Sequence, residues 1–123
     1  MSNHFLQGID TLILRVSNIG TSKTWYIEKL GLKSIHEDTL LKLVVLDTHS
    51  PTSLTLWETD ENIQPHPLTA AYPIFRTPNA REANNELKKR GVTVGEVITD
   101  HVVTYFTFRD PDGNILEACQ VHS

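Results

Sequence analysis

The sequence predicts an α+β fold built from two copies of one βαβββ module. Two series of elements follow one another along the 123 residues, and each reads as a strand, a helix and three further strands. Each expected helix starts at an Asn and stops before a Gly, at Asn18 and Gly31 and again at Asn79 and Gly91. Matched residues of the two series lie about 61 positions apart, as expected for an internal repeat.

The first series begins with a strand at residues 8–18. Apolar side chains occupy its even positions and mixed side chains its odd positions, which is the period of a strand with two different faces. Asn18 is a suitable N-cap for a helix that ends at Leu30, and Gly31 suits the position after it. Three further strands are expected at 32–37, 41–47 and 53–58. The acidic, Pro-containing segment 59–70 follows neither period and is expected to be a linker.

The second series begins with an expected strand at residues 70–79. Asn79 followed by Glu82 resembles a capping box, and Gly91 ends the helix as Gly31 ends the first. The remaining strands are expected at 92–99, 102–108 and 114–120. We therefore predict one domain, 1–123, with module one at about 8–58, the linker at about 59–70 and module two at about 71–121.

Composition argues against several classes of partner. The formal charge of −4 disfavours a nucleic-acid surface or an anionic membrane. The N-terminal residues lack the pattern of a signal peptide, and no apolar run approaches membrane-spanning length. The single cysteine, Cys119, cannot form an intrachain disulfide and suits a reducing compartment. We expect a cytoplasmic protein without nucleic-acid or membrane partners.

The run FRDPDGNILEACQ (108–120) places a carboxylate on an otherwise apolar strand face. Asp110, Asp112 and Asn114 alternate as at the start of an EF-hand, but the Gly and Glu that complete such a loop are missing, so a turn held by side-chain hydrogen bonds is expected. Beyond the turn, Glu117 shares its strand face with Ile115. Burying a carboxylate is costly without a partner. Three roles stay open for Glu117, namely a metal ligand, an acid or base, and a partner for an arginine.

The segments IDTLILRVSNIGTSKTWYIEKLGL (9–32) and FRDPDGNILEACQ (108–120) resemble the vicinal oxygen chelate superfamily. That superfamily includes glyoxalase I, bleomycin-resistance proteins, fosfomycin-resistance enzymes and extradiol dioxygenases. The resemblance extends over residues 8–121 and is to a small, bacterial-type member. It implies paired βαβββ modules that form an open, barrel-like curved sheet around a cleft, and a homodimer.

Metal-dependent members of that superfamily bind a divalent ion at four equivalent points. Matching the modules puts Thr11, Thr55, Tyr72 and Glu117 at those points. Only Glu117 is a normal ligand for such an ion, because neutral Thr and Tyr hydroxyls are poor ligands where imidazole and carboxylate are preferred. The resemblance therefore implies a degenerate metal site, with Glu117 a ligand only if a metal binds at all. No cofactor is expected, and a divalent metal is the alternative.

Strand parity, combined with the cleft of the family, predicts which residues contact a ligand. Arg15, Arg76 and Trp57 would suit a planar or anionic ligand, although each arginine could instead pair with a surface carboxylate. The histidines are expected to be exposed or structural, and a ligand set of His36, His101 and Glu117 is the alternative. The predicted ligand-binding residues are Thr11, Ile13, Arg15, Thr55, Trp57, Tyr72, Ile74, Arg76, Ile115 and Glu117.

The leading functional hypothesis is a small-molecule-binding protein, close in its logic to bleomycin-resistance binders. A first alternative is a divalent-metal-dependent enzyme of the same superfamily, either a glyoxalase-like lyase or a dioxygenase. A second is a metal-free enzyme that uses Glu117 as acid or base and Tyr72 as hydrogen-bond donor. The sequence leaves open whether the protein is an enzyme, which ligand it binds, and whether the cleft forms within one chain or across a dimer.

Overall fold

The computed structural model describes residues 5–123, and these form two βαβββ series in chain order. The first contains β1 (Thr11–Val16), α1 (Ile19–Leu30), β2 (Lys33–Asp38), β3 (Leu43–Asp47) and β4 (Ser53–Glu58). The second contains β5 (Ile74–Arg76), α2 (Ala80–Lys89), β6 (Ile98–Thr99), β7 (Val103–Arg109) and β8 (Ile115–Val121). The predicted fold class is confirmed.

Each series folds into its own four-stranded sheet. The strand orders are β1-β4-β3-β2 and β5-β8-β7-β6, and in both sheets the first pair is parallel while the others are antiparallel. Ile13 lies opposite Thr55 in the first sheet, and Ile74 lies opposite Glu117 in the second. Thr55 and Glu117 therefore occupy the same place in the two modules, as the internal repeat predicts.

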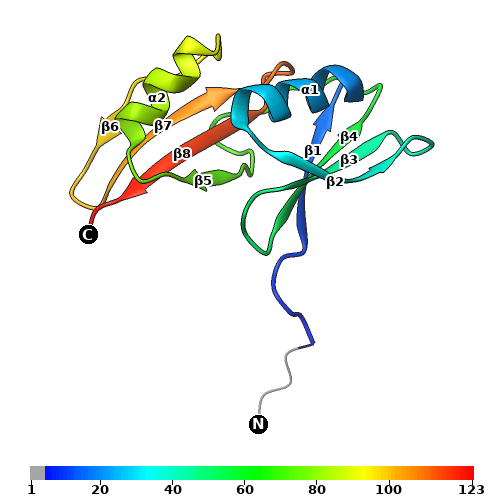
Figure 1. The fold of residues 1–123 in the computed structure, drawn as a ribbon, viewed down its shortest axis with the longest axis horizontal. Coiled ribbons are helices and arrows are strands. Elements are labelled where there is room, and N and C mark those ends of the chain that lie inside the picture. Colours follow the sequence, from blue (N-terminus) through cyan, green and yellow to red (C-terminus); the bar gives the residue numbers. More distant parts are fainter. Residues whose placement is uncertain (1–4) are drawn as a thin grey trace.

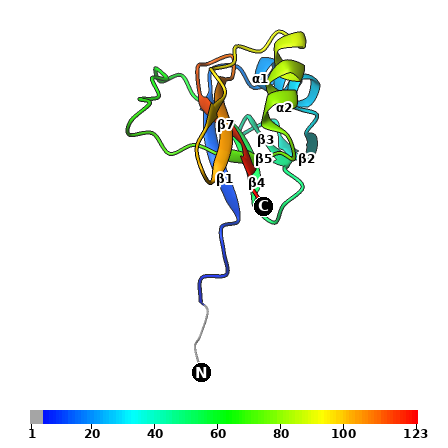
Figure 2. The same cartoon turned by 90° about the vertical axis from the view of Figure 1, so that its left-hand side faces the viewer.

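The two modules lie side by side, and both helices cover the same side of the sheets (Figures 1 and 2). Apolar side chains at alternate strand positions face the helices and form the core, because successive strand residues point to opposite faces. The other face of each sheet carries no helix, and the sheets do not close into a barrel. Core residues include Leu14, Val16, Leu46, Leu54, Leu56, Phe106, Phe108 and Leu116, with Tyr26 and Leu87 from the helices.

The predicted Asn caps are confirmed at both helices and the predicted Gly at the end of α1, whereas α2 ends at Lys89 with Arg90 as its C-cap, one residue before Gly91. Asn18 Oδ1 accepts a hydrogen bond from Thr21 N at 2.9 Å, and Asn79 Oδ1 accepts one from Glu82 N at 3.1 Å. Gly31 has a φ of 72°, a left-handed conformation that glycine adopts without strain, and its N–H bonds back to the carbonyl of Ile27. The local sequence thus sets where each helix starts and stops.

Two strands are shorter than predicted. The expected strand 70–79 is reduced to Ile74–Arg76, because Pro73 and Pro78 flank it and neither can donate a backbone hydrogen bond. The expected strand 92–99 is reduced to Ile98–Thr99 and one bridge near its start. The backbone at Gly95 lies against β7, where Gly95 N donates a hydrogen bond to the carbonyl of Thr107 at 2.7 Å. A Cβ added at position 95 would lie 3.1 Å from that carbonyl oxygen.

Residues 59–70, the expected linker, form neither helix nor strand. This segment projects on the side of the sheets that carries no helix (Figure 2). Within residues 5–123, neither helix combines the length and the apolar character that a bilayer crossing requires.

The turn Asp110–Asn114 is held by side-chain hydrogen bonds, as predicted. Asp110 is buried and accepts from the backbone N–H groups of Asp112 and Asn114, at 2.9 and 2.8 Å, and from Asn114 Nδ2 at 2.9 Å. It also accepts from the hydroxyl of Tyr26 in α1 at 2.8 Å. Burial raises the pKa of the Asp110 carboxyl, although these hydrogen bonds oppose the effect.

The same turn fastens module two to the outer edge of β1. Asn114 Nδ2 donates to the carbonyl of Arg15 at 2.9 Å, and Ser17 N donates to Asp112 Oδ2 at 3.1 Å. Together with the bond between Tyr26 and Asp110, these contacts join the modules at one end of their junction. The position of the second sheet relative to the first therefore depends on these three hydrogen bonds.

Candidate functional site

The candidate site lies on the side of the two sheets opposite the helices, which we call the open face. Its residues alternate with core residues along the strands and therefore point away from the helices. Ile13 is 46% exposed and Ile74 is 56% exposed, so this face is uncovered in the single chain. Predicted ligand-binding residues on it are Thr11, Ile13, Arg15, Thr55, Trp57, Ile74, Arg76, Ile115 and Glu117.

Thr11 and Thr55 form a hydroxyl pair on the first sheet. Their Oγ1 atoms lie 2.7 Å apart, and Thr11 Oγ1 also contacts the carbonyl of Ser53 at 3.2 Å. Thr55 is buried, although it lies on the open face. The two hydroxyls thus hydrogen-bond to each other and to the backbone, and they form a neutral polar site on this sheet.

Arg15 and Trp57 form a fixed cationic and aromatic platform beside that pair. The Arg15 guanidinium carbon lies 5.0 Å from the ring centre of Trp57. Arg15 donates to the carbonyls of Trp57 and Glu58, both at 3.1 Å, and Trp57 Nε1 donates to the carbonyl of Leu41 at 3.0 Å. These bonds orient both side chains before any ligand arrives. Carboxylate pairing, the predicted alternative for Arg15 and Arg76, is found for neither among residues 5–123.

Glu117 is the buried acidic residue of the second sheet. It is 8% exposed and lies between Ile74 of β5 and Thr107 of β7. Its carboxyl group makes no hydrogen bond or ion pair within the described part of the chain, yet its oxygens are not sealed from solvent. Burial raises the pKa of Glu117 and favours its protonated form. In its protonated form this carboxyl can donate a hydrogen bond to a ligand, and in either form it can accept one.

A second cross-strand row lies beside Glu117. Arg76 of β5 is the register partner of Cys119, which in turn faces Tyr105 of β7. Arg76 is exposed, whereas Cys119 and Tyr105 are half-buried. Arg76 and Cys119 become neighbours only through the parallel pairing of β5 with β8, a contact between segments that are far apart in the sequence.

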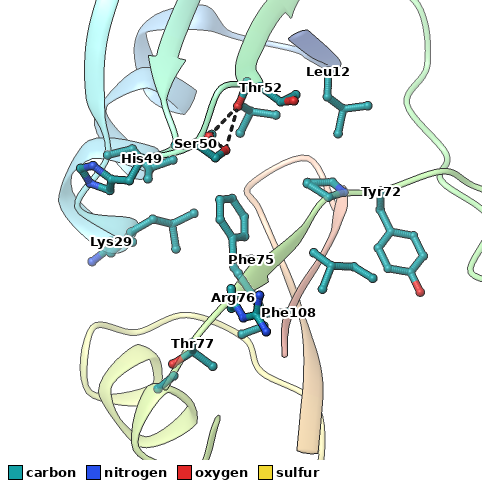
Figure 3. Close-up of a pocket in the computed structure, with 18 of the residues that line it drawn as sticks. Leu12, Lys29, His49, Ser50, Thr52, Tyr72, Phe75, Arg76, Thr77 and Phe108 are labelled. Atoms are coloured by element: carbon teal, nitrogen blue, oxygen red, sulfur yellow. Dashed lines mark hydrogen bonds between the residues drawn. The ribbon is translucent and has the colours of Figure 1, made fainter. Parts of the chain in front are cut away.

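Tyr72 lies outside the strands that carry the other predicted site residues, and it lines a groove together with Ile74 and Arg76 of β5. The groove has a volume of about 940 Å³, lies between the modules and is also lined by residues of β1, β4, α1 and α2. Figure 3 shows Phe75 in the middle of this groove, with Lys29 and His49 on one side and Tyr72 on the other. Sequence reasoning missed the groove, because it forms only where the two modules diverge.

Comparison of the chain with models of protein families identifies its superfamily. The model of the Glyoxalase/Bleomycin resistance protein/Dioxygenase superfamily matches residues 8–118. The chain belongs to this superfamily. This confirms the resemblance found in the two sequence segments and accounts for the paired βαβββ modules.

Solved structures with the same fold are similar to this chain over nearly its whole length. A glyoxalase family protein from Bacillus anthracis, described as putative, is 26% identical with a TM-score of 0.75, covering 99% of this chain and 100% of that one. An integron cassette protein from the mobile metagenome of the Halifax Harbour sewage outfall is 22% identical with a TM-score of 0.80, covering 94% and 100%. TnmS3, an antibiotic binding protein from Streptomyces sp. CB03234, is 20% identical with a TM-score of 0.78, covering 96% and 98%. No curated protein matches the chain.

Superfamily members often use a metal, but the donor set here does not fit one. Of the four matched positions, Thr11 and Thr55 offer neutral hydroxyls that bond to each other, and Tyr72 offers a phenol outside the strand. Glu117 alone offers a carboxylate, on the other sheet. Within residues 5–123, His, Cys, Asp and Glu side chains form no group of three or more suited to a metal ion, so the alternative set of His36, His101 and Glu117 is not assembled.

The histidines that the structure describes are either hydrogen-bonded or exposed. His122 Nε2 lies 2.7 Å from Thr104 Oγ1, and His66 Nδ1 accepts a hydrogen bond from Leu68 N at 3.1 Å. His36, His49 and His101 are exposed. His4 lies outside the described residues.

Proposed function

We propose that this superfamily member binds a small organic molecule on its open face through its own side chains. The observation that carries the proposal is the carboxyl of Glu117, which is buried on a ligand-accessible face and has no partner among residues 5–123. Burying an ionisable group without a partner is unfavourable unless another interaction offsets it. A ligand that hydrogen-bonds Glu117 would supply that interaction.

The residues around Glu117 favour a planar ligand with an anionic or strongly polar group. The platform formed by Arg15 and Trp57 offers a flat surface with a positive charge, and Arg76 adds a second cation. Protonated Glu117 would donate to a carbonyl or phenolate oxygen of the ligand. The remaining contacts would be apolar or weakly polar, from Thr11, Ile13, Thr55, Tyr72, Ile74 and Ile115.

The comparison with TnmS3 is consistent with a binding role. TnmS3 is an antibiotic binding protein and shares the fold of this chain at 20% identity. The two-module scaffold thus serves binding in at least one structural neighbour. For this chain we propose the same class of activity, sequestration of a small molecule, with a different set of contacts.

The open face also supports a homodimer. The open face lies on the same side of both sheets, and Ile13 and Ile74 on it are exposed. A single chain therefore does not enclose a cleft on this face. A second copy facing this side would cover the apolar residues and form a cleft between module one of one copy and module two of the other. The half-buried thiol of Cys119 suits a reducing cytoplasm as the location.

A thermal-shift screen tests the binding proposal. Planar anionic metabolites and aromatic antibiotics should raise the melting temperature of the wild-type chain, because binding to the folded state alone stabilises it. Glu117→Gln and Arg76→Ala should each reduce the shift, whereas Arg81→Ala, a substitution at an exposed arginine of α2, should leave it unchanged. Equal shifts in all four proteins would contradict a site on the open face.

A metal-free acid–base enzyme is the second candidate, and the raised pKa of Glu117 favours it. In that case Tyr72 would serve as hydrogen-bond donor, and turnover would resist chelators and be lost in Glu117→Gln. Metal analysis of protein purified without chelator separates both candidates from a metal-dependent lyase or dioxygenase. Stoichiometric divalent metal that disappears in Glu117→Gln would overturn the proposed function.

A further inference from the structure

Cys119 lies on the open face, beside the buried carboxyl of Glu117. Gln120, the next residue of β8, points to the other side, since its Oε1 accepts a hydrogen bond from Ala80 N at the start of α2 at 2.9 Å. Successive strand residues point to opposite faces, so Cys119 and Glu117 share the face that carries no helix. Cys119 is the single cysteine of the sequence and is half-buried. The chain therefore presents one thiol, and that thiol lies on the open face.

Three side chains of different chemistry surround this thiol in the sheet. Arg76 of β5 is the register partner of Cys119 on one side, and Tyr105 of β7 is its register partner on the other. Glu117 precedes it by two residues along β8. Neighbouring strands lie about 5 Å apart, and residues two apart on one strand are separated by about 7 Å. The Sγ atom of Cys119 is thus bordered by a cation, a phenol and a carboxyl group.

Arg76 provides the positive charge that a reactive thiol needs. The nucleophile in cysteine chemistry is the thiolate, which a neighbouring cation stabilises. Arg76 forms no ion pair among residues 5–123, so no carboxylate of the described chain neutralises its charge. A guanidinium group also stays charged throughout the physiological pH range. Its charge is therefore available both to Cys119 and to an anionic group of a ligand.

Glu117 provides an acid on the same strand face. Its carboxyl is buried and makes no hydrogen bond within the described residues, and burial raises its pKa and favours the protonated form. A protonated carboxyl donates a hydrogen bond to a carbonyl oxygen and can transfer its proton as negative charge develops there. An unpartnered acid and a thiol on one face together match an electrophile with a carbonyl oxygen at one end and a reactive carbon at the other.

We propose that Cys119 captures a planar α,β-unsaturated carbonyl compound on the open face by covalent addition. The inference rests on the proposed binding function and adds to it a ligand class and a reaction. Sγ attacks the β-carbon and forms a C–S bond, while the electron pair of the C=C bond moves toward the carbonyl oxygen. Glu117 donates its proton to that oxygen, and the resulting enol rearranges to the saturated carbonyl compound. The proton lost by the thiol returns to Glu117 through solvent, so the net reaction adds S–H across the C=C bond and needs no oxidant or reductant.

The spacing of the thiol and the acid fits this reaction. An attacking atom lies about 3–3.5 Å from the carbon that it attacks, and a donor lies about 2.6–3.2 Å from its acceptor oxygen. The β-carbon and the carbonyl oxygen of an enone are separated by three bonds. The attacking thiol and the acid must therefore be several ångströms apart and on one face, as Cys119 and Glu117 are at about 7 Å along β8. The flat conjugated ligand would lie against the ring of Tyr105, the partner of Cys119 on β7.

Intact-mass spectrometry with 3-benzoylacrylate tests the proposal in the full chain. This probe is a planar aromatic enone with a carboxylate, so a single adduct should form on wild type and none on Cys119→Ser. Alkylation by iodoacetamide, which needs the thiolate but no acid, serves as the reference for thiol reactivity. Relative to that reference, the enone should add to Cys119 faster than to glutathione by about tenfold or more, because the site holds the probe in position. An equal ratio for the two thiols would overturn the proposal.

Substitutions at the two neighbours of the thiol assign their roles. Glu117→Gln keeps the shape of the side chain but removes the acid, so enone addition should slow by about tenfold or more while iodoacetamide alkylation stays unchanged. Arg76→Ala should slow both reactions, and Arg76→Lys, which keeps the charge, should restore alkylation. Arg81→Ala, at an exposed arginine of α2, should change neither rate. Equal enone rates in wild type and Glu117→Gln would contradict the proposed reaction.

The saturated analogue 3-benzoylpropionate separates this inference from the proposed function. It keeps the ring, the ketone and the carboxylate of the probe but cannot add a thiol. If the analogue raises the melting temperature while the enone adds to Cys119 no faster than to glutathione, covalent capture is overturned and reversible binding stands. If neither the analogue nor any compound of the thermal-shift screen raises the melting temperature, the proposed function fails, and the inference fails with it.

Discussion

Replacing Tyr26 by Phe should destabilise the protein by about 1.5–3 kcal/mol, the range for a lost hydrogen bond to a charged group. Tyr26 is fully buried, and its hydroxyl donates to Asp110 Oδ2 at 2.8 Å. Phe keeps the ring, including its edge contact with Trp25 at 4.9 Å between ring centres, so little cavity is created. Asp110 retains its other three donors, and the cost is that of one hydrogen bond rather than of an unpartnered charge.

The same substitution has a predicted pH dependence. The Tyr26 hydrogen bond lowers the pKa of Asp110 against the larger effect of burial, so its loss raises that pKa further. The variant then binds a proton more readily than wild type in the folded state. The destabilisation should therefore be smallest at low pH, where Asp110 is protonated in both proteins, and should grow as pH rises through the folded-state pKa.

Urea unfolding followed by circular dichroism measures both effects. Tyr105→Phe is the matched control, because Tyr105 is half-buried and its hydroxyl makes no hydrogen bond within residues 5–123. The control should change the free energy of unfolding by less than about 0.5 kcal/mol. A Tyr26→Phe variant as stable as the control, or one whose destabilisation shrinks as pH rises, would refute the reasoning.

Three further substitutions test local features of the fold and the site. Burial raises the folded-state pKa of Glu117, so this residue contributes to stability below its unfolded-state pKa, and the contribution is lost as pH rises through the folded-state pKa. Glu117→Gln should therefore become more stable relative to wild type as pH rises, which urea unfolding measures. The N–H of Ile19 is the main group that lowers the pKa of Glu58, so Glu58→Gln should lower the melting temperature at pH 7, and the difference should vanish as pH falls through the folded-state pKa. Asn18→Ala removes the N-cap of α1 and should cost about 1 kcal/mol in urea unfolding, and a neutral result would show that the cap is dispensable.

Local patterns predicted most of the fold. Caps, turn residues and strand alternation act over a few residues, and the two-module order followed from them without any long-range contact. The predicted strands were too long at residues 70–79, where Pro73 and Pro78 flank the short strand, and at 92–99, where Ile98–Thr99 is the strand. Gly95 shows what the local pattern could not include, because the room for its side chain is set by Thr107, a residue on another strand.

The candidate site was predictable as a face but not as a set of contacts. Alternation alone separates Glu117 from the core residue Leu116, and the repeat pairs Glu117 with Thr55. Alternation could not show that Thr11 and Thr55 bond each other or that Arg15 lies over Trp57, because both contacts depend on the parallel register of β1 with β4.

The sequence by itself therefore determined the modules, their helix ends, the acidic turn and the strand face that carries Glu117. Only the tertiary structure decided how the modules meet: the Asp110–Asn114 turn closes one end of their junction through Tyr26 and β1, and the other end stays open as the groove. The physical reason is the range of the interactions. Propensity and alternation act within one element, whereas the hydrogen bond between Tyr26 and Asp110 exists only after two folded modules dock.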